Sequence, residues 1–106
     1  VERTVEEIKT RFPATAPRGA AADLFVKEQR EALFEKHPDI DILVNNMGIY
    51  ELMRYEDADD EVWDTYFQTI VLAANALTRH YLPKLLEKAY GRVILIASEE
   101  AVMPSG

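Results

Sequence analysis

Small polar residues follow three apolar stretches of the chain. Asp23 lies at the end of the first stretch, Asn45–Gly48 follow the second, and Ser98 follows the third. If these stretches are strands of one parallel sheet, their carboxyl ends meet at the same edge, which is where open α/β sheets bind ligands. The sequence therefore predicts a nucleotide-type ligand at this edge, held by carboxylate, amide and hydroxyl groups.

The elements that would position these residues alternate between helix and strand. Ile40–Val44 and Arg92–Ala97 are nearly continuous apolar runs, which is typical of parallel strands covered on both faces. Arg18–Leu24 is predicted to be a third strand, although alanine is a poor strand former. Helices are predicted at Val1–Phe12, Phe25–Lys36 and Asp57–Tyr90. This order predicts an α/β fold in which right-handed βαβ crossovers build a parallel sheet.

Proline and glycine mark the ends of the longest predicted helix. Pro83 lies inside Asp57–Tyr90 and is expected to kink or divide it, because proline cannot donate the helical hydrogen bond. Gly91 is expected to end the helix, and an aspartate is expected to cap its start. Ser98–Gly106 is expected to be an open loop.

Composition limits the classes of protein to which the chain can belong. It has 106 residues, a net charge of −7 and no cysteine. The length suits one domain, and the acidic balance argues against nucleic acid or an anionic membrane as partners. The lack of cysteine fits a cytoplasmic protein without disulfides or thiolate metal ligands, and we expect no metal site. The chain starts at Val1, so an upstream segment is expected to have been removed by processing or by a cut.

Several segments together resemble the short-chain dehydrogenase/reductase family. Asp41–Ile49 resembles the family signature Asp-x-Leu-Val-Asn-Asn-Ala-Gly-Ile, and Gly91–Ser98 is similar to the strand that ends in the active-site serine. Further similar segments are Ala22–Leu24, Trp63–Phe67 and Leu77–Pro83. The match runs in order along essentially the whole chain. It implies that residues 1–106 are the central part of an NAD(P)-binding domain, with a partial, three-layer Rossmann-like sheet of three strands.

The resemblance also implies roles for individual residues. Asp23 and Leu24 would contact the adenine of NAD or NADP, and Asn46 and Gly48 would flank the adenosine half. Ser98 would donate a hydrogen bond to the oxygen of a carbonyl or alcohol substrate, where negative charge develops during hydride transfer. The full family member would be an NAD(P)-dependent oxidoreductase.

The chain departs from the family pattern at points that matter for catalysis. It contains neither the Gly-rich turn that cradles the diphosphate nor the catalytic Tyr and Lys. Met47 replaces the usual Ala, and Ile70 stands where the family has the Asn of its proton relay. We therefore expect this chain alone to be inactive and to bind the dinucleotide weakly or not at all.

Plainer interpretations stand beside these. Ser98 could be a loop serine, Asn45 and Asn46 could be turn residues, and Asp23 could be a helix cap. His37 and His80 have no partners at metal-ligand spacing and are expected on the surface. The chain as a whole could be a non-enzymatic association or structural module derived from the family.

We also expect a homo-oligomer. In the family's sheet two further strands lie between Arg18–Leu24 and Ile40–Val44, and this sequence does not contain them. Without these two strands a gap of about 10 Å is expected, which backbone hydrogen bonds cannot bridge. Three arrangements would close this gap. The strand at Arg18–Leu24 could move over to pair with Ile40–Val44, a second copy of the chain could fill the gap by exchange, or the missing segments could be present. An unpaired edge and the broad apolar stripe of Asp57–Tyr90 favour association with another chain.

Overall fold

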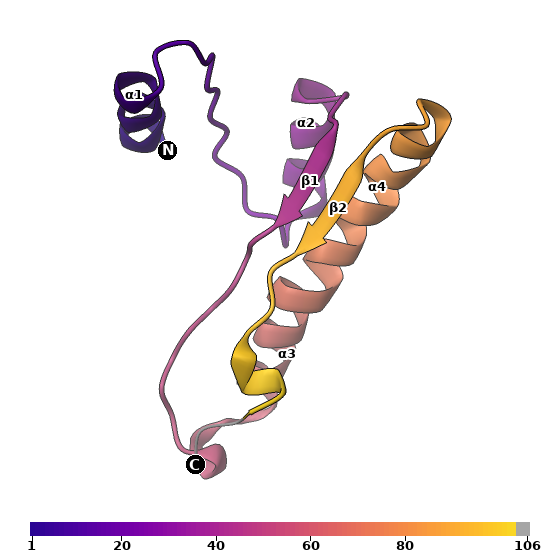
Figure 1. Ribbon diagram of the computed structural model, residues 1–106. Helices are drawn as coiled ribbons and strands as arrows, with labels where there is room; N and C mark the ends of the chain where they lie inside the picture. The colour runs from indigo at the N-terminus through magenta and orange to yellow at the C-terminus, as the bar shows by residue number, and fades with distance from the viewer. Residues whose placement is uncertain (104–106) are drawn as a thin grey trace.

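The computed structural model describes residues 1–103, so Pro104–Gly106, at the end of the expected loop Ser98–Gly106, lie outside the described residues. No helix in the described part of the chain is long and apolar enough to cross a membrane. In chain order the elements are α1 (Glu2–Arg11), α2 (Lys27–Lys36), β1 (Ile42–Asn45), the 3₁₀ turn η1 (Tyr55–Asp57), α3 (Asp60–Tyr66), the π-helical segment η2 (Phe67–Leu72), α4 (Ala73–Glu87), β2 (Arg92–Leu95) and the 3₁₀ turn η3 (Glu99–Ala101) (Figure 1).

The sheet consists of β1 and β2, which pair in parallel. Ile42 is opposite Arg92 and Asn45 is opposite Leu95. One more hydrogen bond, from the Ile96 nitrogen to the Asn45 oxygen at 3.1 Å, continues the ladder past the end of β2. Parallel neighbours need a long crossover, and the helical run α3–η2–α4 supplies it (Figure 1). The α/β class predicted from the alternating pattern is therefore confirmed.

The core lies between one face of this sheet and the helices behind it. Leu43 of β1 is buried together with Leu77 and Tyr81 of α4. The residues packed around them, each partly buried, are Leu24, Leu33, Phe34, Ile40, Met47 and Val93. Ile42, Val44 and Ile94 point to the opposite face, where they are 51%, 52% and 43% exposed. Among the described residues, this second face of the sheet is uncovered.

The predicted third strand at Arg18–Leu24 is wrong. Residues 12–26 form no strand, and the described sheet has two strands where three were expected. A strand exists only where a neighbour completes its hydrogen bonds, and here none lies beside this segment. Its alanines lie instead against α2, where Ala20, Ala21 and Ala22 line a shallow depression with Gln29, Ala32, Leu33 and Lys36.

The long helical run continues without a break from Asp60 to Glu87. Asp59 caps its start, since its Oδ1 accepts a hydrogen bond from the Val62 nitrogen at 3.0 Å. Pro83 lies inside α4 and does not divide it, so the second of the two expected effects, a kink or a division, does not occur. The helix tolerates it because Pro83 is exposed, so that water can bond the carbonyl group it leaves free. The irregular segment is η2 instead, where the helix widens to π geometry.

Polar contacts tie the end of α4 to the start of β1. The Lys88 Nζ donates to Asp39 Oδ1 at 2.7 Å, to the Ile40 oxygen at 2.8 Å and to Asp41 Oδ1 at 2.9 Å. These two carboxylates raise the pKa of Lys88, and Lys88 lowers the pKa of Asp39. The Tyr81 hydroxyl donates to the His37 oxygen at 2.7 Å. Together these bonds hold β1 in register with the helix.

The chain exposes more surface than its mass requires. Its accessible surface is 8857 Å², whereas a compact 12.1 kDa monomer exposes about 6,000 Å². Its radius of gyration is 16.6 Å, against about 13 Å for a compact domain of this length. The difference in area, roughly 2,800 Å², is surface that a self-contained domain would bury.

Candidate functional site

The sheet places two of the three predicted polar segments at one edge. Asn45 and Leu95 are the last paired residues of β1 and β2. Asn46 follows the first of these strands directly, and Ser98 lies three residues beyond the end of the second. The carboxyl ends of the two parallel strands therefore bring the amide and the hydroxyl segments to the same edge, as the sequence predicted.

Ser98 is exposed and begins the 3₁₀ turn η3. Its Oγ accepts a hydrogen bond from the Glu100 nitrogen at 3.2 Å, so it stabilises the turn as a loop serine would. A hydroxyl that accepts one bond still has its proton to donate. The structural role and the predicted donation to a substrate oxygen are therefore compatible.

Asp23 and Leu24 lie shortly before α2, in the segment that Figure 1 shows reaching α2 near the arrowhead of β1. The Asp23 Oδ1 accepts from the Phe25 nitrogen at 3.0 Å, and the Asp23 nitrogen donates to Gln29 Oε1 at 2.7 Å. The N-cap residue of α2 is Val26, so Asp23 forms a local turn and is not the cap itself. Leu24 packs against the buried cluster, which anchors this turn near the sheet edge.

Asn46 and Gly48 are both exposed in the segment that follows β1. Gly48 does not have a positive φ, and a Cβ placed on it would meet nothing within 4 Å. The described fold thus has no need of glycine at this position. A glycine there leaves room for another molecule to approach the backbone closely.

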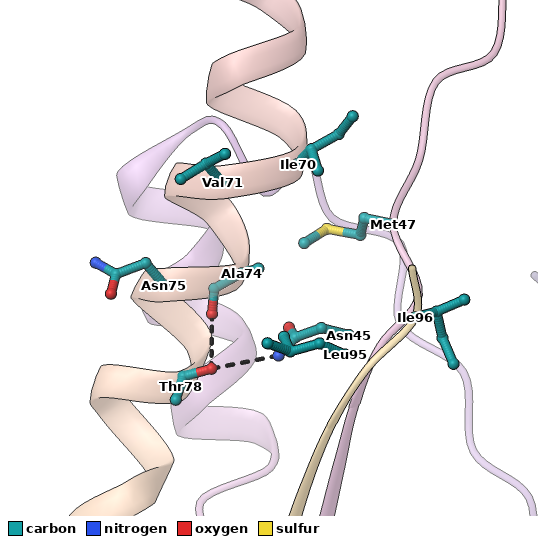
Figure 2. Close-up of a pocket in the computed structure, with 9 residues that line it drawn as sticks. All are labelled: Asn45, Met47, Ile70, Val71, Ala74, Asn75, Thr78, Leu95 and Ile96. Carbon is teal, nitrogen blue, oxygen red and sulfur yellow. Dashed lines mark hydrogen bonds between the residues drawn. The ribbon is translucent and has the colours of Figure 1, made fainter. Parts of the chain in front are cut away.

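An open pocket of about 410 Å³ lies between this sheet edge and the helical run (Figure 2). It is lined by Asn45, Met47, Ile70, Val71, Ala74, Asn75, Thr78, Leu95 and Ile96. Ile70 belongs to η2, so the widened part of the helix borders the pocket. Apolar side chains form most of the wall, including Ile70 at the position where the resembled family has Asn.

The sequence interpretation missed the role of Asn45 in this pocket. Asn45 is only 6% exposed, and its Nδ2 donates to Thr78 Oγ1 at 3.3 Å. Thr78 in turn donates to the Ala74 oxygen at 2.9 Å. Strand alternation offered a signal, because Asn45 lies two residues after the buried Leu43 and so points to the same face.

His80 is not the surface histidine that the sequence predicted. It is half-buried, and its ring stacks on Phe34 with centroids 3.7 Å apart. Its Nε2 is buried without a hydrogen-bond partner in the described part of the chain. Burial lowers the pKa of His80, and the charge of Lys84 lowers it further. The described residues contain no group of three or more His, Cys, Asp or Glu side chains that could hold a metal ion.

With this geometry, comparisons with known proteins identify the family. Residues 1–106 match the family model described as short chain dehydrogenase. The chain therefore belongs to the short-chain dehydrogenase family, as its resemblance to the family motifs predicted.

Individual relatives agree with this assignment. The chain is 44% identical over 105 residues to the "Uncharacterized oxidoreductase YvaG" of Bacillus subtilis (strain 168), covering 99% of this chain and 40% of the relative. It is also 44% identical over 107 residues to "Uncharacterized oxidoreductase YvrD" of the same organism, covering 98% and 40%. The chain thus spans about two fifths of the length of these curated relatives.

A solved structure supports the Rossmann-like architecture. The crystal structure of L-sorbose reductase from Gluconobacter frateurii, complexed with NADPH and L-sorbose, superposes with a TM-score of 0.86 at 30% identity. The match covers 98% of this chain and 41% of the reductase. Residues 1–103 therefore have the fold of the corresponding part of such an enzyme. Their described sheet has two strands, not the three that the sequence predicted.

Proposed function

We propose that the complete product of the gene encoding this chain is an NAD(P)-dependent oxidoreductase. It would transfer hydride between the nicotinamide cofactor and a small-molecule carbonyl or alcohol substrate. The observation that carries this proposal is the meeting of the Asn46 and Ser98 segments at one sheet edge, with Asp23 in the turn beside it, in a chain of this family. Residues 1–106 would be the central part of its NAD(P)-binding domain.

The residues at this edge fit a dinucleotide. Asp23 and Leu24 would meet the adenine, while Asn46 and Gly48 would flank the adenosine half. The open space around Gly48 supports this, because a ligand can lie directly against its backbone. NAD or NADP would supply or accept the hydride.

Ser98 would be the substrate-binding residue of this chain. Its hydroxyl proton is free to donate to the substrate oxygen while its Oγ accepts from Glu100. Such a donor stabilises the charge that builds up on that oxygen and is worth about 10²–10³ in kcat in comparable sites. The hydroxyl adds no charge of its own, so it suits both the carbonyl and the alcohol form of the substrate.

The 106-residue chain alone would catalyse no measurable hydride transfer and would bind NAD or NADP weakly or not at all. Residues 1–106 contain no Gly-x-x-x-Gly-x-Gly turn and no Tyr-x-x-x-Lys pair. Ile70, which is aliphatic and lines the pocket, cannot relay a proton as the family's Asn does. Hydride transfer by this isolated chain, abolished by Ser98→Ala, would overturn this part of the proposal.

Gly48→Ala tests the cofactor site in the complete gene product. The added methyl group meets no protein atom, so the melting temperature should stay within about 1 °C of the wild type. Dinucleotide affinity, measured by calorimetry with NAD and NADP, should fall at least tenfold, or about 1.4 kcal/mol. Unchanged affinity for both dinucleotides would show that Gly48 is not part of the site.

Ser98→Ala tests the catalytic role in the same protein. Turnover of a panel of ketones and alcohols should fall about 10²-fold or more while dinucleotide affinity is retained. Thr10→Ala is the matched control, because the Thr10 hydroxyl is exposed and bonds only a carbonyl of its own helix. Equal turnover in wild type and Ser98→Ala would refute the assignment.

We also propose that the protein is a homo-oligomer located in the cytoplasm. Apolar side chains exposed along the helical run, among them Trp63, Phe67 and Leu82, support association. Sedimentation of the complete product at micromolar concentration tests this, and a stable monomer would contradict it. The same surface supports a second candidate function, a non-enzymatic association module. A complete product that forms oligomers but binds neither NAD nor NADP would favour this second function over the oxidoreductase.

A further inference from the structure

Two side chains of α2 hold the turn at residues 23–26. The guanidinium of Arg30 reaches back along its own helix, and its Nη1 donates to the Leu24 oxygen at 2.6 Å and to the Phe25 oxygen at 3.0 Å. The Gln29 Oε1 accepts a hydrogen bond from the Asp23 nitrogen at 2.7 Å. A cation on α2 therefore binds two carbonyl groups of the turn, while an acceptor on α2 binds one of its backbone amides.

The bonds from Arg30 satisfy carbonyl groups that the helix cannot. Val26 is the N-cap residue of α2, so the Leu24 and Phe25 carbonyls precede the first carbonyl that accepts a helical hydrogen bond. A hydrogen bond from a charged donor is roughly twice as strong as one between neutral groups. Arg30 is also partly buried, which limits competition from water. The orientation of the turn relative to α2 therefore depends on Arg30.

The helix α2 is itself anchored in the core, so the turn is held by a rigid element. Leu33 and Phe34, which lie one turn further along α2, pack against the buried cluster of the core. The Phe34 ring also stacks on His80 of α4, with ring centroids 3.7 Å apart. The residues of a binding site have to be held to within about 0.5 Å, and hydrogen bonds from rigid neighbours provide this. Arg30 and Gln29 connect the turn to the fixed part of the fold in this way.

We propose that Arg30, assisted by Gln29, is a positioning residue of the dinucleotide site. This inference rests on the proposed function, in which Asp23 and Leu24 meet the adenine. A carboxylate can only accept hydrogen bonds, so Asp23 suits the 6-amino group of adenine, which donates them. Arg30 would not touch the cofactor. It would act through the turn, by holding the Asp23 carboxylate where the base arrives.

The affinity ratio of two dinucleotides tests this role in the complete gene product. Nicotinamide hypoxanthine dinucleotide differs from NAD in the base, in which a carbonyl oxygen replaces the 6-amino group. A carboxylate repels that oxygen. Calorimetry should therefore show that NAD binds at least about tenfold more tightly than this analogue, which is about 1.4 kcal/mol. For a protein that prefers NADP, NADP is compared with its hypoxanthine counterpart in the same way.

Variants of Arg30 then assign this ratio to α2. Arg30→Met removes both hydrogen bonds to the turn but keeps a long side chain, and it should lower the ratio to about threefold or less. Arg30→Lys keeps a cationic donor and should hold the ratio above about fivefold. Arg11→Met is the matched control, because Arg11 is exposed at the end of α1, where its guanidinium lies 6.0 Å from the centroid of the Phe12 ring. It should leave the ratio at its wild-type value.

A second variant keeps the test open if Arg30→Met fails to fold. Gln29 is exposed, and Gln29→Met removes only the acceptor for the Asp23 nitrogen. It should also lower the ratio, because the turn loses one of its bonds to α2. Melting temperatures of all variants are measured alongside the affinities, so that loss of stability and loss of selectivity are recorded separately.

Three results would overturn the proposal. An Arg30 that only stabilises α2 would lower the melting temperature of Arg30→Met and leave the ratio unchanged. A wild-type ratio near one would mean that the turn does not read the base. A complete product that binds neither NAD nor NADP would remove the proposed function together with this inference. Tight binding of a dinucleotide with the same ratio in Arg30→Met would refute the role of Arg30 alone.

Discussion

Ala89→Gly should stabilise the fold, because Ala89 adopts a backbone conformation that suits glycine. Its φ is 53°, which is in the left-handed region. It follows the C-cap residue Lys88 at the end of α4, in a turn closed by two hydrogen bonds. The Ala89 nitrogen donates to the Leu86 oxygen at 3.0 Å, and the Tyr90 nitrogen donates to the Leu85 oxygen at 3.3 Å. This is the Schellman pattern, in which glycine is the usual residue at this position.

The expected gain is the difference between two effects. The left-handed conformation costs an L-residue about 1–2 kcal/mol. Glycine avoids this cost but loses about 0.5–1 kcal/mol more chain entropy on folding. Ala89→Gly should therefore raise the free energy of unfolding by about 0.5–1 kcal/mol, and the melting temperature by roughly 2–8 °C. Ala76→Gly makes the same chemical change inside α4 and should lower that free energy by about 1 kcal/mol.

Urea unfolding followed by circular dichroism at 222 nm measures both variants against the wild type. The midpoint should rise for Ala89→Gly and fall for Ala76→Gly, with similar m-values. A midpoint that falls or stays the same for Ala89→Gly, while Ala76→Gly behaves as expected, would refute the reasoning. It would show that the end of α4 does not have this conformation in solution.

Two further predictions concern the packing of α2 and α4 against the start of β1. Tyr81→Phe removes the hydroxyl that donates to the His37 oxygen at 2.7 Å and should cost about 1–3 kcal/mol of unfolding free energy in urea, because that oxygen loses its partner. His80 lies on Phe34, and burial together with Lys84 lowers its pKa from 6.5. The unfolded chain therefore takes up this proton first, so stability should fall as pH drops below about 6.5; a His80→Gln variant with an unchanged pH profile would contradict this.

The periodic pattern predicted the elements that are regular over several turns or lie in the sheet. Ile40–Val44 covers all of β1 except Asn45, Arg92–Ala97 contains β2, and Phe25–Lys36 contains α2. These predictions succeeded because local spacing of apolar residues decides which side of an element can be buried. The widening of the helix at η2 had no such signal, since π geometry does not follow from residue type alone.

The candidate site was predictable only in part. The order of motifs placed Asn46 and Ser98 at strand ends, and parallel pairing of β1 with β2 brings those ends together. The same motifs could not show that Asn45 is bonded to Thr78, 33 residues away along the chain. His80 was expected on the surface because it has no partner at metal-ligand spacing. Its stacking on Phe34 depends on how α2 and α4 pack, which that spacing does not show.

The amino-acid sequence by itself determined the family, the α/β class and the identity of the polar residues at the strand ends. Only the tertiary structure decided that residues 18–24 are not a strand, since strand formation depends on hydrogen bonds to a neighbour that local sequence does not specify. It also decided which atom of the Asn45 amide has no hydrogen-bond partner among the described residues. That depends on a chain of two hydrogen bonds through Thr78 to Ala74, and such a chain exists only after the helix has packed on the sheet.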